Sequence, residues 1–161
     1  MAERRYIYRG KILSLVIEDG RWEIVEHKDA VAIIAVREGR VLMVRQYRPA
    51  IKRETLELPA GLIEPGESPL EAARRELREE AGFDAELKEL FSFYSSPGFT
   101  DEKITLFFAE SLRPAPLAPD PGERLTPLWL PLDEALGKLF SGELLTSSPT
   151  VAGLLWLSQK R

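Results

Sequence analysis

The chain has 161 residues, of which 44% are hydrophobic and 30% are charged, a size and composition that suit one globular domain with a substantial core. Its net charge of -4 gives no overall basic field for holding a nucleic-acid backbone. Cysteine is absent, which excludes disulfides, thiolate metal sites and cysteine nucleophiles. No apolar run approaches the ~20 residues of a membrane helix, and the opening residues lack the apolar stretch of a signal peptide. We therefore expect a cytoplasmic protein without nucleic-acid or membrane partners.

The amino-acid usage also favours stability at high temperature. Asparagine is absent, glutamine occurs only at Gln46 and Gln159, and the chain contains 12 prolines. Residues prone to thermal damage are thus nearly missing, whereas residues that stiffen loops are plentiful. We interpret this pattern as a sign of thermophilic origin, which predicts a melting midpoint above the ordinary mesophilic range.

The first part of the chain has the alternating pattern of β-strands. Asp19 and Gly20 form a DG pair between two alternating runs, which predicts a hairpin and a small antiparallel unit at the start of the chain. The later run VAIIAV is apolar throughout and predicts a strand buried on both faces. The expected strands are residues 11–18, 21–27, 31–36 and 41–47, the last two joined by a polar turn over 37–40.

A central helix is predicted from its end signals. Ser68 as N-cap, Pro69 at the first helical position and Glu71 three residues after the cap make a capping box with the favoured early proline. Gly82 supplies the stop. One side of this helix is apolar and is expected to pack on a sheet; it carries Leu70, Ala73, Leu77 and Ala81.

The second half of the chain continues the interleaving of strands and helices, which predicts an α/β protein. Residues 113–122 carry four prolines and are expected to form an extended surface loop. Gly142 ends one predicted helix, and Ser148 with Pro149 opens another. The expected elements are strands at 86–94, 103–110 and 125–130, a helix at 133–140 and a final helix from 148.

Beside its apolar face, the central helix carries Glu76, Glu79 and Glu80. Like charges at i,i+3 and i,i+4 repel by about 0.2 to 0.5 kcal/mol per pair, so this stripe is unfavourable unless a cation occupies it. Oxygen-only ligands favour magnesium or manganese. Glu67, in the loop before the helix, is expected to approach the same site. The alternative is that these glutamates are solvated, as isolated glutamates usually are.

A longer pattern favours the metal site. Residues 61–83 match every fixed position of G-x5-E-x7-R-E-U-x-E-E-x-G-U, where U is a bulky apolar residue. The matching residues are Gly61, Glu67, Arg75, Glu76, Leu77, Glu79, Glu80, Gly82 and Phe83. This motif is the Nudix box, and the chain resembles a Nudix hydrolase over nearly its whole length. The resemblance implies a single domain over residues 1–161, an α/β/α sandwich around a mixed β-sheet, with an N-terminal antiparallel β unit at 1–28.

The resemblance also assigns metal ligands. Glu76 and Glu80 would be the first ligands, Glu79 and Glu67 would share ions or water, and the Ala60 carbonyl would complete the shell. Two or more Mg²⁺ ions are expected, with Mn²⁺ or Zn²⁺ as substitutes.

By the same resemblance, Arg75 orients the glutamates and one of two glutamates acts as general base. Glu79 is the candidate within the box, and Glu123 is the candidate in the loop after it. The alternatives are a surface ion pair between Arg75 and Glu79 and a solvated Glu123. His27, the only histidine, follows an alternating strand and is interpreted as structural.

Residues that flank the box resemble the ADP-ribose pyrophosphatase subfamily. The similar segments are 45–49, 57–61 and 96–102, and Pro97 lies where that subfamily has a proline. Arg48 is interpreted as a phosphate ligand because a guanidinium holds phosphate oxygens in a bidentate manner; the alternative is a surface charge at a strand end. The other residues of these segments expected to bind substrate are Arg45, Ser96, Gly98, Phe99 and Glu102.

Similar enzymes are homodimers in which the N-terminal strands pack against the partner and help to line the adenosine pocket. The matching positions here are Ile12, Arg21 and Glu23, so residues 1–28 are the expected dimerisation element. Strand alternation places Trp22 on the side opposite to Arg21 and Glu23, in the core or in the interface.

The resemblance therefore implies metal-dependent hydrolysis of the pyrophosphate bond of ADP-ribose to AMP and ribose 5-phosphate. Two alternatives stay open. One is a Nudix enzyme for another substrate, such as a nucleotide sugar, a dinucleoside polyphosphate or a damaged nucleoside triphosphate. The other is a non-catalytic Nudix-like nucleotide-binding domain, which typically lacks box glutamates that this chain retains.

Overall fold

A computed structural model describes residues 1–160 and divides their strands between a small N-terminal sheet and a larger sheet. The small sheet is antiparallel, in the order β1-β2-β3. The predicted hairpin is confirmed, since Asp19 and Gly20 turn between β2 and β3 with φ angles of 51° and 66°. The strands are β1 (Arg4–Arg9), β2 (Leu13–Glu18) and β3 (Trp22–His27), of which β1 was not predicted.

The larger sheet has seven strands in the order β10-β5-β4-β9-β8, with β6 paired to β5 and β7 paired to β4. It is mixed, because β4 and β9 run parallel while the other pairs are antiparallel. Its strands are β4 (Ala30–Arg37), β5 (Arg40–Arg48), β6 (Arg53–Glu57), β7 (Ala60–Leu62), β8 (Phe83–Tyr94), β9 (Lys103–Pro114) and β10 (Leu125–Pro131).

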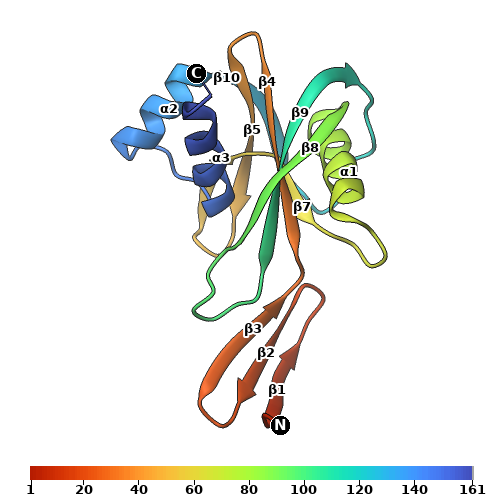
Figure 1. Ribbon diagram of the computed structural model, residues 1–161, viewed down its shortest axis with the longest axis vertical. Helices are drawn as coiled ribbons and strands as arrows, with labels where there is room; N and C mark the ends of the chain where they lie inside the picture. Colours follow the sequence, from red (N-terminus) through yellow and green to blue (C-terminus); the bar gives the residue numbers. More distant parts are fainter. Residues whose placement is uncertain (161) are drawn as a thin grey trace.

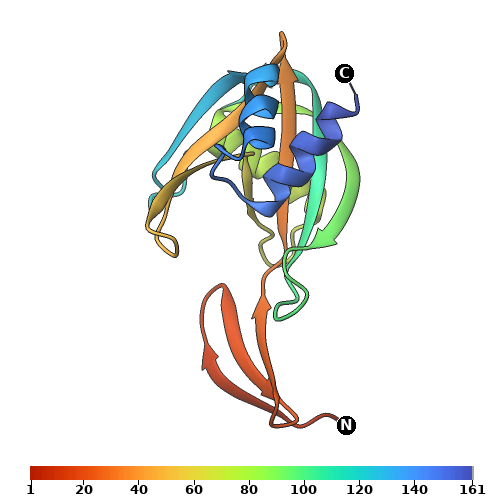
Figure 2. The same cartoon turned by 90° about the vertical axis from the view of Figure 1, so that its left-hand side faces the viewer.

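Helices cover both faces of the larger sheet (Figures 1 and 2). Helix α1 (Pro69–Ala81) lies on one face, and helices α2 (Leu132–Ser141) and α3 (Ser148–Ser158) lie on the other. Central strand β4 is buried from Ala30 to Ala35, and Val36 is partly exposed. Such burial is expected for a strand with helices on both faces of its sheet. The predicted α/β/α sandwich around a mixed sheet is therefore confirmed.

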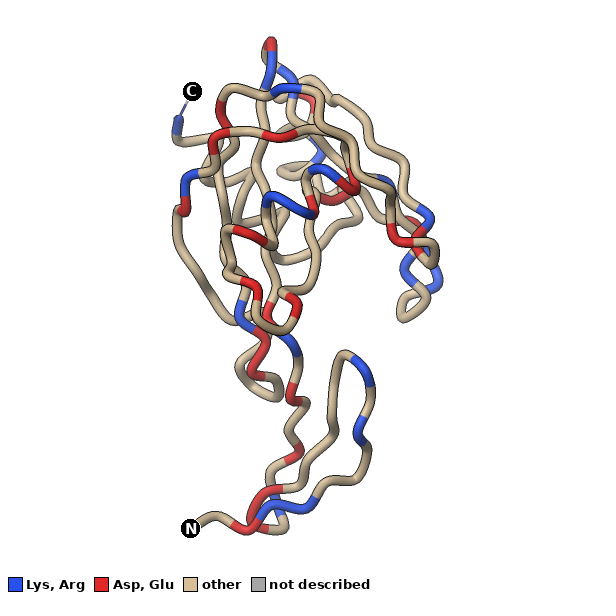
Figure 3. The backbone as a smooth tube through the Cα atoms, turned by 90° about the vertical axis from the view of Figure 1, so that its right-hand side faces the viewer, with Lys and Arg blue, Asp and Glu red and all other residues tan. Residues whose placement is uncertain are grey.

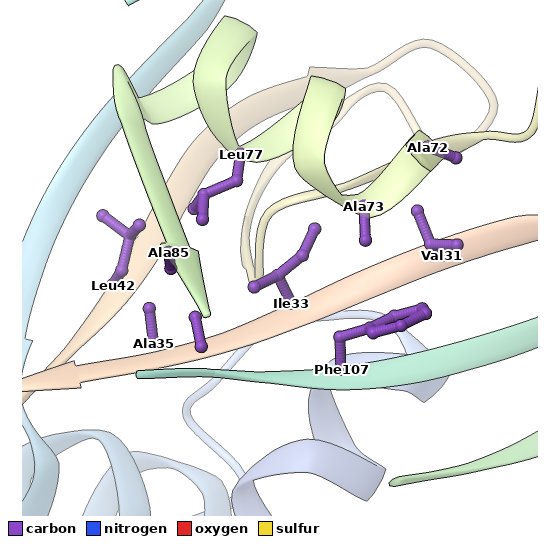
Figure 4. Packing of buried hydrophobic residues seen from close by; sticks show 10 residues of the cluster. Val31, Ile33, Ala35, Leu42, Ala72, Ala73, Leu77, Ala85 and Phe107 are labelled. Carbon is purple, nitrogen blue, oxygen red and sulfur yellow. The ribbon is translucent and has the colours of Figure 1, made fainter. Parts of the chain in front are cut away.

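The core beneath α1 fixes where its glutamates lie. Ala73 and Leu77 of α1 face Val31 and Ile33 of β4, and Phe107 of β9 closes the cluster (Figure 4). The predicted packing face is wrong at one end, because Leu70 is 43% exposed. The helix is rotated toward β7, so its buried residues are Ala72, Ala73, Glu76, Leu77 and Glu80.

The N-terminal sheet projects away from the sandwich (Figures 1 and 2). Within residues 1–160, no helix or second sheet packs along its length, and Val16 is the one residue of its strands that is buried. Large apolar side chains stay exposed on it, namely Ile7, Tyr8, Ile12 and Trp22. A three-stranded sheet needs a packed face to be stable, so this surface lacks the cover that such a sheet requires.

Acidic and basic positions are interspersed along the chain, as the red and blue segments of Figure 3 show. Of the helices in residues 1–160, none has the length and apolar character needed to cross a bilayer. The proline-rich segment begins later than predicted, because Arg113 and Pro114 still belong to β9.

Candidate active site

Local sequence signals hold helix α1 in one position. The predicted capping box is confirmed: Ser68 Oγ accepts the Glu71 N–H at 3.1 Å, and Glu71 Oε2 accepts the Ser68 N–H at 2.7 Å. Gly82 ends the helix in the left-handed region, with φ of 77°, which favours glycine. These caps fix where the helix begins and ends, and its packing on the sheet turns Glu76 and Glu80 toward strand β7.

Two glutamates of the helix are buried against the backbone of β7. Glu76 is 7% exposed and Glu80 is 8% exposed. The Ala60 N–H donates to Glu80 Oε2 at 3.1 Å. A Cβ atom placed on Gly61 would lie 2.0 Å from the carboxyl carbon of Glu76, so Gly61 is required for this close approach.

Arg75 joins most of the box carboxylates. Its Nε and Nη2 donate to the two carboxylate oxygens of Glu67 at 2.8 and 2.9 Å. Its Nη1 donates to Glu76 at 2.6 Å and to Glu79 at 3.2 Å, and its Nη2 also reaches the Leu62 carbonyl at 2.9 Å. An arginine has five N–H groups, and these contacts occupy all of them. Arg75 therefore orients the glutamates and has no donor left for a substrate.

The two buried glutamates have raised pKa values. Burial, followed by the charge of Glu76, raises the pKa of Glu80 to about 9. Burial also raises the pKa of Glu76 to about 7, although hydrogen bonding and charge from Arg75 oppose this shift. The Arg75 hydrogen bond lowers the pKa of the less buried Glu67. Two carboxyl groups this close and this buried disfavour a second negative charge unless a cation compensates it.

The donor set fits a hard divalent cation, because it consists of buried carboxylate oxygens. In residues 1–160, however, three or more acidic or imidazole side chains do not already converge on one metal position. The reason lies in the contacts of Arg75, which hold oxygens of Glu67, Glu76 and Glu79.

A cavity of about 860 Å³ opens beside α1 and β7, a volume within the range of about 300 to 1,000 Å³ typical of ligand pockets. Carboxylates outnumber cationic side chains in its lining. The acidic residues are Glu57, Glu64, Glu76, Glu79, Glu102, Asp120 and Glu123, and the cationic ones are Lys28, Arg48 and Arg75.

The structure brings about half of the predicted site residues to this cavity. Those that line it are Ile12, Arg48, Ala60, Glu76, Glu79, Glu102 and Glu123. Glu67 and Glu80 lie just behind it, in contact with Arg75 and Ala60 respectively. Those that lie outside it are Arg21, Glu23, Arg45, Ser96, Gly98 and Phe99.

The residues outside the cavity are there for two reasons. Arg45 alternates along β5 with Gln46, and Gln46 lines the cavity, so Arg45 points to the opposite face. Arg21 and Glu23 lie at the far end of the N-terminal hairpin, beside the turn at Asp19. Of the N-terminal residues that the structure describes, Ile12, His27 and Lys28 line the cavity of their own chain.

Loop 96–102 ties the N-terminal sheet to the sandwich. Val25 N–H donates to the Phe99 carbonyl at 2.7 Å, and Thr100 Oγ1 donates to the Val25 carbonyl at 2.7 Å. His27 N–H donates to Asp101 Oδ1 at 2.8 Å. The His27 ring lies 2.6 Å from the Lys28 carbonyl and 3.1 Å from Glu102. The loop therefore shapes the cavity wall by holding β3 in place.

Glu123 reaches the cavity from the proline-rich loop. The start of this loop is fixed on α1, because Arg78 Nε donates to the Ala115 carbonyl at 2.9 Å. Burial, followed by the charges of Asp120 and Glu79, raises the pKa of Glu123. Glu123 is therefore close enough to the box to feel its charge, as a loop base must be.

Several cavity residues were not anticipated from the sequence, namely Lys28, Glu57, Ser147 and Ser148. Ser148 was predicted only to begin a helix, and Glu57 was named only as part of segment 57–61, which resembles the subfamily. The signal available for Glu57 was an acidic residue between the apolar residues Leu56 and Leu58.

The fold and the site together define a class: an α/β/α sandwich whose capped central helix presents buried glutamates to a nucleotide-sized cavity. Comparison with known proteins agrees with this description. Residues 26–147 match the family model of the NUDIX domain. The chain belongs to the NUDIX domain family.

Relatives of known function are similar over much of the chain. It is 43% identical over 119 residues to the ADP-ribose pyrophosphatase of Bacillus subtilis. The match covers 68% of this chain and 64% of that protein, so the chain spans less than two thirds of the length of that relative. It is 41% identical over 138 residues to the ADP-ribose pyrophosphatase of Mycobacterium tuberculosis, covering 83% of this chain and 66% of that protein.

A longer match is with the methanol dehydrogenase activator of Bacillus methanolicus, 38% identical over 158 residues, which covers 91% of this chain and 85% of that protein. A crystal structure of an ADP compounds hydrolase superposes with a TM-score of 0.81 at 24% identity, over 99% of this chain and 92% of the other. That likeness supports the fold.

Proposed function

We propose that the protein hydrolyses the pyrophosphate bond of ADP-ribose, yielding AMP and ribose 5-phosphate, in a reaction that depends on divalent metal ions. The observation that carries the proposal is the burial of Glu76 and Glu80 against Ala60 and Gly61 at the edge of the cavity. The choice of ADP-ribose is supported by the two relatives named as ADP-ribose pyrophosphatases and by the flanking residues Arg48 and Pro97.

The acidic lining of the cavity supports the metal dependence. A pyrophosphate would be repelled by carboxylates that outnumber the cationic side chains around it. Two or more Mg²⁺ ions, held by Glu76, Glu80, Glu67, Glu79 and the Ala60 carbonyl, would neutralise the substrate charge and activate a water. Mn²⁺ or Zn²⁺ would serve as substitutes.

Side chains of the protein supply the remaining functions. Arg75 holds the glutamates in place. Glu79 in the box and Glu123 on the loop are the two candidates for the base that takes the proton of the attacking water, since both line the cavity. Arg48 and Glu102, also in the lining, would contact the phosphate and ribose part of the substrate.

We also propose a homodimer in which the N-terminal sheet is the dimerisation element. Apolar area is exposed at Ile7, Tyr8, Ile12 and Trp22, on a sheet that no second layer covers in the described part of the chain. A second copy of the chain would cover this area. Arg21 and Glu23 lie far from the cavity of their own chain, so in this proposal they act at the cavity of the partner. The wall between the two subunits at the cavity would be formed by Ser96, Gly98 and Phe99.

A hydrolysis panel tests the proposed function. With Mg²⁺, the protein is expected to convert ADP-ribose to AMP and ribose 5-phosphate in clear preference to GDP-mannose, diadenosine polyphosphates and deoxynucleoside triphosphates. Activity restricted to triphosphates would replace ADP-ribose with another NUDIX substrate. Nucleotide binding without hydrolysis of any of them would favour a non-catalytic domain. The cytoplasmic location and the thermophilic origin stay predictions.

A further inference from the structure

A bidentate ion pair lies in the lining of the cavity, close enough to the box helix for Arg48 and Glu80 to interact electrostatically. Arg48, the last residue of β5, donates from Nε to Glu57 Oε2 at 2.7 Å and from Nη2 to Glu57 Oε1 at 2.9 Å. Glu57 ends the neighbouring antiparallel strand β6. Both residues line the cavity, and the geometry is the planar fork arrangement that fixes a guanidinium most firmly.

Glu57 is itself held in place by hydrogen bonds from neighbouring residues. It is 4% exposed, and Thr55 Oγ1 donates to its Oε2 atom. Burial alone would raise the pKa of Glu57, but hydrogen bonds from Arg48, Thr55 and Ser147 outweigh burial and lower it. Glu57 is therefore ionised at neutral pH, and its position is set by groups on two strands and on the segment before α3.

The pair leaves part of the Arg48 guanidinium for a ligand. Two of its five N–H groups point at Glu57, and within residues 1–160 no other hydrogen bond from its side chain is formed. The Arg48 side chain is 42% exposed, whereas that of Glu57 is 5% exposed, and Arg48 lines the cavity, so a ligand there can reach the remaining N–H groups. Arg75, the other cavity arginine, has all its donors on protein acceptors.

We propose that Glu57 is a positioning residue, which holds the Arg48 guanidinium so that its open edge binds the phosphates of the substrate. The inference rests on the proposed function, in which Arg48 is a phosphate ligand. An arginine already fixed in one rotamer loses little freedom on binding, whereas a mobile one must be ordered by the ligand. Because the phosphates are charged before and during the reaction, the benefit falls on substrate binding more than on the chemical step.

The test compares Glu57→Gln with Glu54→Gln, a matched change at an exposed position of the same strand. Glu57→Gln is expected to raise KM for ADP-ribose by roughly tenfold, the scale of ordering one long side chain, with kcat changed less than about threefold. Glu54→Gln is expected to leave both constants unchanged. A Glu57→Gln protein with wild-type KM, or one that loses kcat while KM is unchanged, would overturn the inference.

Two further variants separate positioning from a merely structural role. Arg48→Lys keeps the charge but not the fork, so it should raise KM on its own, and adding Glu57→Gln to it should raise KM no further. Additive effects in the double variant would contradict the proposal. Thr55→Val removes one support of Glu57 and should raise KM in the same direction by a smaller factor, which keeps the test usable if Glu57→Gln folds poorly.

Calorimetric titration with inorganic pyrophosphate and Mg²⁺ makes the result independent of the substrate assignment. The dissociation constant should rise in Glu57→Gln and Arg48→Lys and stay constant in Glu54→Gln. If the wild-type protein does not hydrolyse ADP-ribose but this pattern is seen, the proposed substrate fails and the positioning role stands. If it hydrolyses ADP-ribose and Glu57→Gln binds pyrophosphate normally, the positioning role fails alone.

Discussion

The carboxyl group of Glu76 lies directly over the Cα atom of Gly61, in the space that a side chain at Gly61 would occupy. The carboxylate comes from helix α1, and the absence of a side chain at Gly61 on strand β7 leaves space for it. This relationship brings the box glutamate to the backbone of Ala60 and Gly61, and it makes a single methyl group a test of the site.

Gly61→Ala is expected to reduce hydrolysis by roughly 100-fold or more, because displacing a reacting group by about 1 Å has that effect. The added Cβ would meet the far end of the Glu76 side chain at 2.0 Å, and this end can move aside. The melting midpoint should therefore change little. Gly137→Ala, where a Cβ meets nothing within 4 Å, is the control and should keep full activity; equal activity of both variants would contradict the placement of Glu76.

Arg75→Lys is expected to lower kcat by roughly 100-fold. A lysine keeps the charge but has a compact ammonium group that cannot reach Glu67, Glu79 and the Leu62 carbonyl together. Steady-state kinetics checks this expectation. Arg113→Lys, an exposed partner of Asp84, is the control and should behave as wild type; a fully active Arg75→Lys enzyme would show that the glutamates need no such organiser.

The raised pKa of Glu80 predicts how the metal-free protein responds to pH. A carboxyl group whose pKa rises from 4.5 to about 9 on folding contributes stability below pH 4.5 that is lost as the pH rises toward 9. Glu80→Gln has no charge to bury, so its free energy of unfolding should rise relative to that of the wild type by about 4 kcal/mol between pH 5 and pH 8, because each of these three pH units is worth about 1.4 kcal/mol.

Denaturant unfolding in EDTA at several pH values measures this difference. Saturating Mg²⁺ should remove the advantage of Glu80→Gln, because the ion stabilises the ionised wild-type site. If the difference in free energy of unfolding between Glu80→Gln and the wild type stays constant with pH, the pKa of Glu80 is not raised by burial.

The N-terminal sheet predicts a dimer that contributes to catalysis. Sedimentation at micromolar concentration is expected to show a dimer, and Trp22→Ser should weaken it, since Trp22 is 51% exposed within one chain. Arg21→Ala should raise KM although Arg21 lies outside the cavity of its own chain. A clean monomer with wild-type activity would remove the partner from the site.

Sequence signals of short range predicted most of the fold. The capping box of α1, the Asp19-Gly20 turn and the buried strand β4 each depend on a few neighbouring residues, and each was confirmed. Strands β6 and β7 are short and were not predicted, because their pairing partners on β5 and β4 are set by the tertiary fold. The exposure of Leu70 has the same origin, since it depends on how α1 is rotated against the sheet.

The site was predictable where a motif fixes it and not where distant segments meet. The box named Glu76, Glu79, Glu80 and Arg75, and the structure places them together. The pairing of Arg48 with Glu57 could not be predicted from the sequence. It joins residues on two strands, and no local sequence signal gives the register between those strands. The positions of Arg21 and Glu23 raise the same difficulty, with the added one that their proposed partner is another subunit.

The most direct test of the central claim is the rate of ADP-ribose hydrolysis by Glu76→Gln and Glu80→Gln in saturating Mg²⁺, measured by AMP release. Both side chains keep their size, and circular dichroism should show an intact fold. Metal-dependent hydrolysis at the box predicts that each variant loses activity by orders of magnitude, and that EDTA abolishes wild-type activity. Rates near wild type in either variant would contradict the account.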